Sequence, residues 1–491
     1  MYLFYLILFL GLLYAYIKYI FSFWARNGFP YLEPVIPFGN MKSFAKKKAS
    51  FGLTTWEMYQ KSDKAFVGVY IFINPTLLIR DVDLVKKVLV TDVEYFFDRG
   101  VYINEYREPI SATLFSLKGN NWKNLRQKLS PLFSSGKLKN MFPTILNEID
   151  HLDRYVGKMA ENNEVIEFKD ILQRYVLNVI GSVFFGIDLD TIADPKHPFR
   201  EINKDLSENR DAFENIRTAL VFLAPKLIDL LRISPFNPKI KSFFYDVVNS
   251  TIDHRTTNKV TRNDFMQLLI DLKDSGSGLT VDQIVANAFL FFIAGTETTS
   301  GTAGFCLYEL ALQPNIMHRV QEEIDEVLAK HNGEISYDSI QEMEYLEMCV
   351  KETLRKYPGL PMLNRECTKD YKIPNSNLTI KKGTAILIST MGLHYNPEYF
   401  ENPDTFEPER FRKGSETYNK DAYIPFGEGP RQCIAVRMGF MGAKAAVVKL
   451  LSKYSFETVS NKPIEFDTIS VALLAKGGLP LRATKRSGSV S

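Results

Sequence analysis

An apolar run opens the chain. Residues 1–17 carry no charged side chain, and Lys18 and Arg26 follow the run. This length suffices for a helix that spans a bilayer. The start lacks the basic residues of a cleaved signal peptide, and bulky residues occupy the region where cleavage would occur. We therefore expect an uncleaved membrane anchor over residues 1–20, with a buried core helix as the alternative. Positive charge after the anchor favours a cytosolic body.

Prolines interrupt the pattern after this run. The stretch GFPYLEPVIPFGN contains Pro30, Pro34 and Pro37, and none of these can continue a helix. We interpret residues 21–40 as a stiff hinge that sets the body, residues 41–491, against the membrane. The body has no internal repeat and no long flexible linker. It is expected to be one compact unit.

Two kinds of periodicity alternate along the body. Residues 65–90 resemble short strands, with Asn74-Pro75 as a turn signal between two of them. From about residue 120 to 355 the pattern is mostly that of amphipathic helices. Strand-like pieces return near residues 371–390 and in the last 30 residues. The pattern predicts an α+β fold that is mostly helical, with a minor sheet.

Composition and charge exclude several classes of protein. The net charge, 60 − 57 = +3, is too small for a nucleic-acid-binding surface. The four cysteines form no CxxC pair, which argues against a zinc site, and they are too sparse for a disulfide framework. We expect reduced thiols in a cytosol-facing body. These cysteines are Cys306, Cys349, Cys367 and Cys433.

The stretch FGEGPRQCIA places Cys433 on a tightly shaped loop before an apolar helical pattern. The cysteine could be a nucleophile, a metal ligand or an inert core residue. A nucleophile needs a nearby base, and none of the six histidines adjoins the loop. An inert cysteine would not need Gly427 and Gly429 before it. Glycines let backbone amides turn toward the sulfur, and amides and a helix N-terminus stabilise a thiolate, as an axial haem ligand requires.

This loop resembles the haem-binding signature of cytochrome P-450 monooxygenases, Phe-x-x-Gly-x-Arg-x-Cys-x-Gly. Phe426, Gly429, Arg431 and Cys433 match the signature, and Ala435 stands where glycine is usual. The resemblance implies haem b with Cys433 as the iron ligand, Phe426 packed near the sulfur and Arg431 paired with a haem propionate. The methyl group of Ala435 is expected to tighten the packing against the haem without removing the ligand.

A second motif, AGTETT at residues 294–299, lies inside an apolar run long enough for a helix that crosses the whole core. Its glycine, threonines and glutamate are poor helix formers and are costly in an apolar helix. A local kink with the glutamate in water is one interpretation. The resemblance to the family's oxygen-activation helix implies another. In that interpretation Thr298 hydrogen-bonds the distal oxygen, Glu297 relays protons through water, and small Ala294 leaves room for substrate.

Four weaker motifs accompany these two, and the motifs occur in the order that the family shows. ETLR and FEPERF resemble a buried ion network, which implies structural roles for Glu352, Arg355 and Arg410. WKNLR and PMLNREC resemble partners of the haem propionates, which implies that role for Trp122, Arg126 and Arg365. Alone, each could be an ordinary solvated ion pair or a packed tryptophan. Two buried carboxylates do need several cations.

The anchor and hinge resemble those of microsomal members, and the basic transit peptide of mitochondrial members is missing. The resemblance implies the endoplasmic reticulum membrane, with the catalytic body in the cytosol. It also implies electrons from NADPH through NADPH–cytochrome P-450 reductase, with cytochrome b5 as a further candidate partner. The candidate docking residues, for which ordinary solvated charge is the alternative, are Lys123, Lys128, Lys137, Lys139, Arg437 and Lys444.

Segments such as LNRECTKDYKIP look like those of the insect xenobiotic-metabolising clan. This implies insertion of one oxygen atom from O2 into lipophilic small molecules such as plant toxins or insecticides. An endogenous hormone or lipid is the alternative substrate. The resemblance suggests mostly apolar substrate-contacting residues, each of which could instead be an ordinary core residue: Leu114, Phe115, Phe291, Ile293, Ala294, Met362, Leu363, Ala472 and Leu473.

Two other functions are compatible with a haem whose iron is bound by a cysteine thiolate. One is a reductase-independent haem–thiolate isomerase or dehydratase, and the other is a non-catalytic haem carrier or gas sensor. Neither needs a distal proton relay. The presence of Glu297 and Thr298 argues against both, and dependence on NADPH and reductase would separate them from a monooxygenase.

Overall fold

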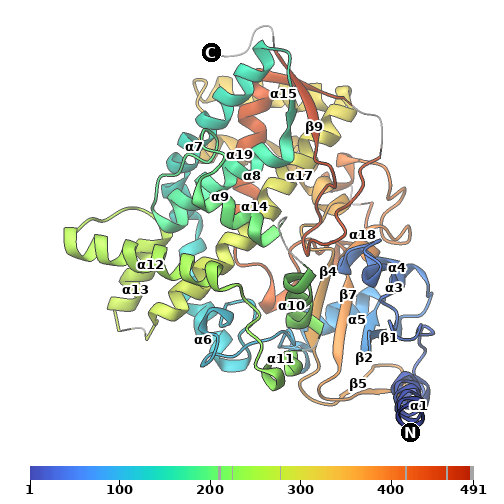
Figure 1. Cartoon of the computed structure of the whole chain (residues 1–491). Coiled ribbons are helices and arrows are strands. Elements are labelled where there is room, and N and C mark those ends of the chain that lie inside the picture. Colours follow the sequence, from blue (N-terminus) through green and yellow to red (C-terminus); the bar gives the residue numbers. More distant parts are fainter. Residues whose placement is uncertain (208–211, 224, 277, 415–416, 460–462, 487–491) are drawn as a thin grey trace.

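In the computed structural model most of the helices gather on one side of the molecule, and the largest sheet lies on the other side with a few short helices and α1 beside it (Figure 1). The structure describes residues 1–207, 212–223, 225–276, 278–414, 417–459 and 463–486. The helices of the first half are α1 Tyr2–Phe21, α2 Phe23–Arg26, α3 Lys42–Ala45, α4 Phe51–Gln60, α5 Val82–Lys86, α6 Gly119–Leu129, α7 Ser135–Glu161, α8 Phe168–Ile180, α9 Pro198–Ser207, α10 Ala212–Leu223 and α11 Pro225–Leu231. The later helices are α12 Pro238–Asn258, α13 Phe265–Asp274, α14 Val281–Leu312, α15 Pro314–Lys330, α16 Tyr337–Glu342, α17 Glu344–Lys356, α18 Thr390–His394 and α19 Val436–Lys453.

The strands form three small sheets, as the predicted α+β fold requires. The largest has the order β1-β2-β7-β4, in which only β2 and β7 run parallel. The other two have the orders β3-β9-β8 and β5-β6. The strands are β1 Phe66–Ile71, β2 Asn74–Ile79, β3 Val165–Glu167, β4 Met362–Glu366, β5 Tyr371–Lys372, β6 Thr379–Ile380, β7 Ala385–Ser389, β8 Tyr454–Thr458 and β9 Pro480–Lys485.

The turn between β1 and β2 differs from the prediction. It lies at residues 72–73, whereas Asn74 and Pro75 are the first residues of β2 and pair with β1. A proline is tolerated there because the pairing of β2 with β7 begins only at Thr76. The turn signal was therefore displaced by two residues, while both strands were predicted correctly.

The predicted hinge is packed onto the sheet rather than free. Trp24 is 2% exposed, and its Nε1 donates to the Val69 carbonyl oxygen at 3.1 Å. The Tyr70 hydroxyl donates to the Phe21 carbonyl oxygen at 2.7 Å. Gly68 is needed in β1 because any Cβ there would overlap the Trp24 indole. These contacts fix the end of α1 to the body. Within the described residues, α1 alone is long and apolar enough to cross a membrane, and none of its apolar window is buried.

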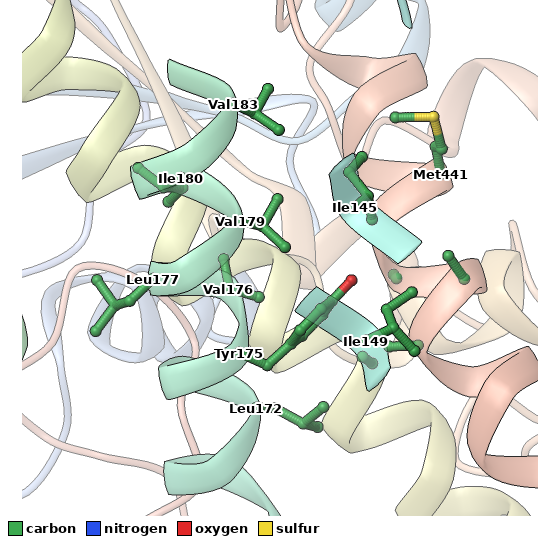
Figure 2. Close-up of a cluster of buried hydrophobic side chains, with 14 of the residues drawn as sticks. Ile145, Ile149, Leu172, Tyr175, Val176, Leu177, Val179, Ile180, Val183 and Met441 are labelled. Atoms are coloured by element: carbon green, nitrogen blue, oxygen red, sulfur yellow. The ribbon is translucent and has the colours of Figure 1, made fainter. Parts of the chain in front are cut away.

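Helix α14 is the central element of the helical side and packs against α8, α17 and α19. Side chains of α7, α8 and α19 meet in an apolar cluster beside it, which includes Ile145, Ile149 and Met441 (Figure 2). The helix is unbroken through AGTETT, and the hydroxyls of Thr296 and Thr298 are satisfied inside it by carbonyl oxygens four residues earlier. Thr296 Oγ1, for example, donates to the Phe292 carbonyl oxygen at 2.7 Å. The motif therefore lies on a continuous helix, without the break that a kink would introduce.

Candidate active site

The loop before α19 is held by backbone hydrogen bonds. Gly427 and Gly429 both adopt positive φ angles, 71° and 72°. A Cβ at Gly429 would overlap the Leu89 carbonyl oxygen, so only glycine fits there. The Cys433 N–H donates to the Phe426 carbonyl oxygen at 3.0 Å, which closes the loop. This geometry fixes the cysteine immediately before the first turn of α19.

The Cys433 sulfur faces an internal cavity. The side chain is open on the cavity side and is otherwise surrounded by protein atoms. Burial raises the pKa of the Cys433 thiol, whereas the Ala435 N–H and the guanidinium groups of Arg126 and Arg99 act to lower it. A thiol in such a position becomes a thiolate when a metal cation binds to it. Ala435 also lines the cavity, and its φ of −101° is unstrained for a residue with a Cβ.

The cavity lies between α14, α8 and α19, with β4 at its margin. Its α14 wall contains Ala294, Thr298 and Thr302, and its α19 wall contains Met438 and Gly442. Most of the remaining lining is apolar. The space therefore suits a largely apolar group that can reach the Cys433 sulfur.

Four guanidinium groups, those of Arg99, Arg126, Arg365 and Arg431, line one margin of this cavity. Three nitrogen atoms have no hydrogen-bond partner although they are buried: Arg99 Nε, Arg365 Nε and Arg431 Nη1. Burial and mutual repulsion lower the pKa of Arg431 to about 9 and also lower that of Arg365, and burial lowers that of Arg99 to about 10. Asp98, 3.5 Å from Arg431 Nη2, is the carboxylate paired with this group. So many buried cations require anions from a bound group.

Haem b fits this set of donors. Its two carboxylates would meet the unpartnered guanidinium nitrogens, its iron would take the Cys433 sulfur, and the apolar walls of α8 and α14 would contact its hydrocarbon surface. The donors come from widely separated parts of the sequence, from Arg99 to Cys433, and the fold brings them to one cavity.

The comparison with known families decides the identity of the chain. The family model described as Cytochrome P-450 matches residues 30–480. The chain belongs to the cytochrome P-450 family. It is 40% identical over 505 residues to a protein named probable cytochrome P-450 6d4 of Drosophila melanogaster, with 98% of each chain covered. It is also 40% identical over 517 residues to cytochrome P-450 6d3 of Musca domestica, with 99% of each chain covered.

Family membership confirms the predicted fold class and the predicted enzyme class. This P-450 is a haem- and iron-binding monooxygenase, and the similarity to insect members is consistent with oxidation of xenobiotics. The family uses O2 and electrons supplied by a reductase. The apolar helix α1 is compatible with a membrane anchor.

The residues predicted to hold the haem all line the one cavity: Trp122, Arg126, Arg365, Phe426, Arg431 and Cys433. The Trp122 ring lies 4.2 Å from the Arg431 guanidinium carbon, and Arg126 Nη1 donates to the Gln432 carbonyl oxygen at 3.0 Å. Arg99 was missed by the sequence analysis although its Nη2 donates to the Arg431 carbonyl oxygen at 2.9 Å. A single arginine beside an aspartate gives no sequence signal of its own.

The predicted substrate residues divide into two groups. Those that line the cavity are Leu114, Phe115, Phe291, Ala294 and Leu363. The other four lie outside its lining: Ile293 is partly buried in the helical core, Met362 packs in the cluster beneath the sheet, and Ala472 and Leu473 are buried. The cavity is also lined by Val176, Val179 and Ile180 of α8, which look in the sequence like any apolar helix face.

Thr298 and Glu297 take different positions. Thr298 lines the cavity, and its hydroxyl donates to the Ala294 carbonyl oxygen at 2.7 Å. Glu297 precedes it on α14 and is not part of the cavity lining. The structure therefore brings Thr298 to the same space as Cys433, whereas Glu297 lies outside the cavity lining.

A buried ion cluster is formed by Glu352, Arg355 and Arg410. Glu352 and Arg355 are both 0% exposed, and two guanidinium nitrogens of Arg355 donate to the two Glu352 carboxylate oxygens at 2.8 and 2.9 Å. Arg410 Nε donates to Glu352 Oε1 at 3.1 Å. The remaining Arg355 and Arg410 donors reach backbone carbonyl oxygens, so the cluster is well satisfied.

One of the predicted docking residues is wrong. Lys444 is 2% exposed, and its Nζ donates to the Met343 carbonyl oxygen at 3.3 Å, so it cannot meet a partner protein. The segment that joins α16 to α17 covers this part of α19. The other candidates, Lys123, Lys128, Lys137, Lys139 and Arg437, are exposed or half-buried.

We expect Arg99→Gln to have opposite effects on the haem-free and haem-bound protein. Loss of one cation from the cluster should weaken haem binding by roughly tenfold to a hundredfold, because a buried charged hydrogen bond contributes roughly 1.5–3 kcal/mol. The same change should raise the thermal unfolding temperature of the haem-free protein, because repulsion is relieved. Haem titration and thermal unfolding would measure the two effects.

A cation outside the cavity supplies the control. Arg482→Gln removes a guanidinium that pairs with Glu457 at 3.2 Å on the surface, and it should change neither haem affinity nor haem-free stability appreciably. A lower unfolding temperature for the haem-free Arg99→Gln protein would contradict the electrostatic account of the cluster.

Proposed function

We propose that this P-450 uses NADPH, through NADPH–cytochrome P-450 reductase, to insert one oxygen atom into lipophilic xenobiotics such as plant toxins or insecticides. The observation that carries the proposal is one apolar cavity with Cys433 on one wall and Thr298 on another. The similarity to insect members of the family supports the choice of xenobiotics over endogenous compounds.

Cys433 is the proposed iron ligand, and the guanidinium groups of Arg126, Arg365 and Arg431, with the Trp122 ring beside them, are the proposed partners of the carboxylates. The bound haem supplies the redox chemistry by which one atom of O2 enters the substrate and the other leaves as water. The protein holds the sulfur in place, excludes bulk water with apolar walls and positions a lipophilic substrate beside Ala294. Phe426 shields the sulfur, with its ring 5.5 Å from that of Phe440.

Thr298 is proposed to handle protons at the cavity wall. Its own proton is committed to the Ala294 carbonyl oxygen, so its remaining lone pairs can accept a hydrogen bond from a water in the cavity. Rotation of the hydroxyl hydrogen away from the Ala294 carbonyl oxygen would let Thr298 donate a proton into the cavity, while one of its lone pairs takes up a proton from water. Glu297, on the same turn of α14, is proposed to supply those protons through water from the periphery of the cavity.

We expect Thr298→Ala to uncouple the enzyme. NADPH consumption should continue, while product formed per NADPH falls by roughly tenfold or more, because positioned proton donors contribute at least that much to proton transfer. Reconstitution with reductase, with NADPH, product and peroxide measured together, tests this. Thr298→Ala with fully coupled turnover would contradict the proton role.

Ser300→Ala is the matched control for this variant. Ser300 makes the same kind of bond, from its hydroxyl to the Thr296 carbonyl oxygen at 2.6 Å, but it is buried away from the cavity lining. Loss of a helix-bonding hydroxyl alone should leave the ratio of product to NADPH unchanged.

The proposed setting is the endoplasmic reticulum membrane, with α1 as the anchor and the body in the cytosol. The hinge contacts at Trp24 and Tyr70 would hold the body in one orientation at the surface. The proposed contact with the reductase, or with cytochrome b5, uses the cations near the sulfur side: Lys123, Lys128, Lys137, Lys139 and Arg437. Acidic partners would be attracted by such a surface.

A further inference from the structure

His394 ends α18 and is 0% exposed. Its Nδ1 lies 2.9 Å from the Arg355 carbonyl oxygen, and Arg355 Nη1 donates to the His394 carbonyl oxygen at 3.0 Å. The two residues are therefore joined in both directions. Since Arg355 is held by Glu352, the imidazole is fixed to the buried ion cluster.

The other ring nitrogen faces the segment that leads to Cys433. The Ile424 N–H donates to His394 Nε2 at 3.1 Å. This assigns the imidazole proton to Nδ1, where it is donated to the Arg355 carbonyl oxygen, and leaves the Nε2 lone pair as acceptor. Burial, assisted by the charge of Arg355, lowers the pKa of His394 to about 3, so the ring is neutral at physiological pH. Its face stacks on Tyr423, with ring centroids 5.6 Å apart.

Backbone bonds continue from Ile424 to the cysteine. The Ile424 carbonyl oxygen accepts the Gly427 N–H at 3.0 Å, and the Phe426 carbonyl oxygen accepts the Cys433 N–H at 3.0 Å. His394 thus stands between a rigid ion cluster and the start of the loop that presents the sulfur. It is not part of the cavity lining, so any effect on the sulfur must pass through this loop.

We propose that His394 is a positioning residue for the Cys433 thiolate. The neutral imidazole transmits the rigidity of the Glu352–Arg355–Arg410 cluster to residues 424–433 and so sets the distance at which the sulfur meets a bound metal. The inference rests on the proposed role of Cys433 as the iron ligand. A purely structural histidine would stabilise the fold without affecting the bond between sulfur and metal.

Two variants of His394 separate these roles. His394→Phe keeps an aromatic face against Tyr423 but removes both hydrogen bonds, whereas His394→Gln keeps one donor and one acceptor. The fraction of haem that shows the thiolate band in the reduced carbon-monoxide difference spectrum is the measurement. We expect it to fall severalfold in His394→Phe and to be largely restored in His394→Gln.

Gln321→Leu is the matched control. Gln321 is also buried, and its Nε2 donates to the Tyr454 carbonyl oxygen and to Ser455 Oγ, both at 3.1 Å, away from the cysteine loop. This variant loses two buried hydrogen bonds as well, so it should unfold at a lower urea concentration while keeping the thiolate fraction of the wild type. Equal thiolate fractions in His394→Phe and Gln321→Leu would overturn the proposal.

A measurement on the unchanged protein covers the case in which His394→Phe does not fold. The Ile424 amide is expected to exchange its hydrogen as slowly as amides of the core helices, although it lies outside any helix or strand. Rapid exchange at Ile424 would overturn the proposal. A wild-type protein that binds haem without a thiolate band would instead refute the ligand role of Cys433, so the two failures are distinguishable.

Discussion

Cys433→Ala is expected to abolish the thiolate band in the reduced carbon-monoxide difference spectrum and to eliminate monooxygenase turnover. The sulfur of Cys433 is the thiol that faces the cavity, and the loop that holds it allows little movement of the backbone. The arginines at the margin and the apolar walls remain, so some haem should still bind. The expected product is therefore a haem-containing but inactive protein whose Soret band lacks thiolate character.

Cys367→Ala tests whether any thiol would serve. Cys367 is buried, and its Sγ donates to the Lys369 carbonyl oxygen at 2.9 Å, in the cluster beneath the sheet. Burial raises the pKa of its thiol to about 11. This variant should keep the wild-type spectrum and turnover. A Cys433→Ala protein that retained the thiolate band would refute the ligand assignment.

The sequence alone predicts those parts of the site whose residues are unfavourable in the helix or loop that contains them. The cysteine loop places glycines, an arginine and a cysteine before an apolar helix, and AGTETT places three threonines inside one. Such residues lower the stability of the fold unless they serve a function. These motifs led to Cys433, Arg431 and Thr298, all of which line the cavity. The length of the apolar run around AGTETT likewise predicted the long central helix α14, because a helix apolar on all sides must be buried.

The residues that the sequence analysis missed have no such unfavourable feature. Arg99 looks like a surface arginine until the fold buries it beside Arg431, and the α8 side chains of the cavity look like ordinary core. The prediction that Lys444 belongs to the docking surface was wrong for a related reason. Lys444 lies seven residues after Arg437 on α19, and periodicity places both on one face. Periodicity does not show that the segment between α16 and α17 covers only the second of them.

Glu352→Gln should cause the largest loss of stability among single changes in the buried ion cluster. The carboxylate of Glu352 accepts hydrogen bonds from both Arg355 and Arg410 and also from the Glu407 N–H, at 2.8–3.1 Å. An amide cannot neutralise two buried guanidinium groups, and its own N–H group would face theirs. We expect a loss of about 3–5 kcal/mol in the free energy of unfolding, as for other buried pairs that lose one partner. Urea unfolding of the purified full chain measures it.

Glu465→Gln is the control that shows whether the loss of stability in Glu352→Gln depends on burial or only on the loss of a charge. Glu465 pairs with Lys476 at 3.2 Å, but both side chains are largely exposed, so water can replace the lost partner. Its loss should cost less than about 1 kcal/mol. If Glu352→Gln cost as little, the cluster could not be what holds Arg355 against His394 and the α18 end. Because Arg355 also donates to the His394 carbonyl oxygen, Glu352→Gln should in addition lower the thiolate fraction of the haem, which Glu465→Gln should leave unchanged.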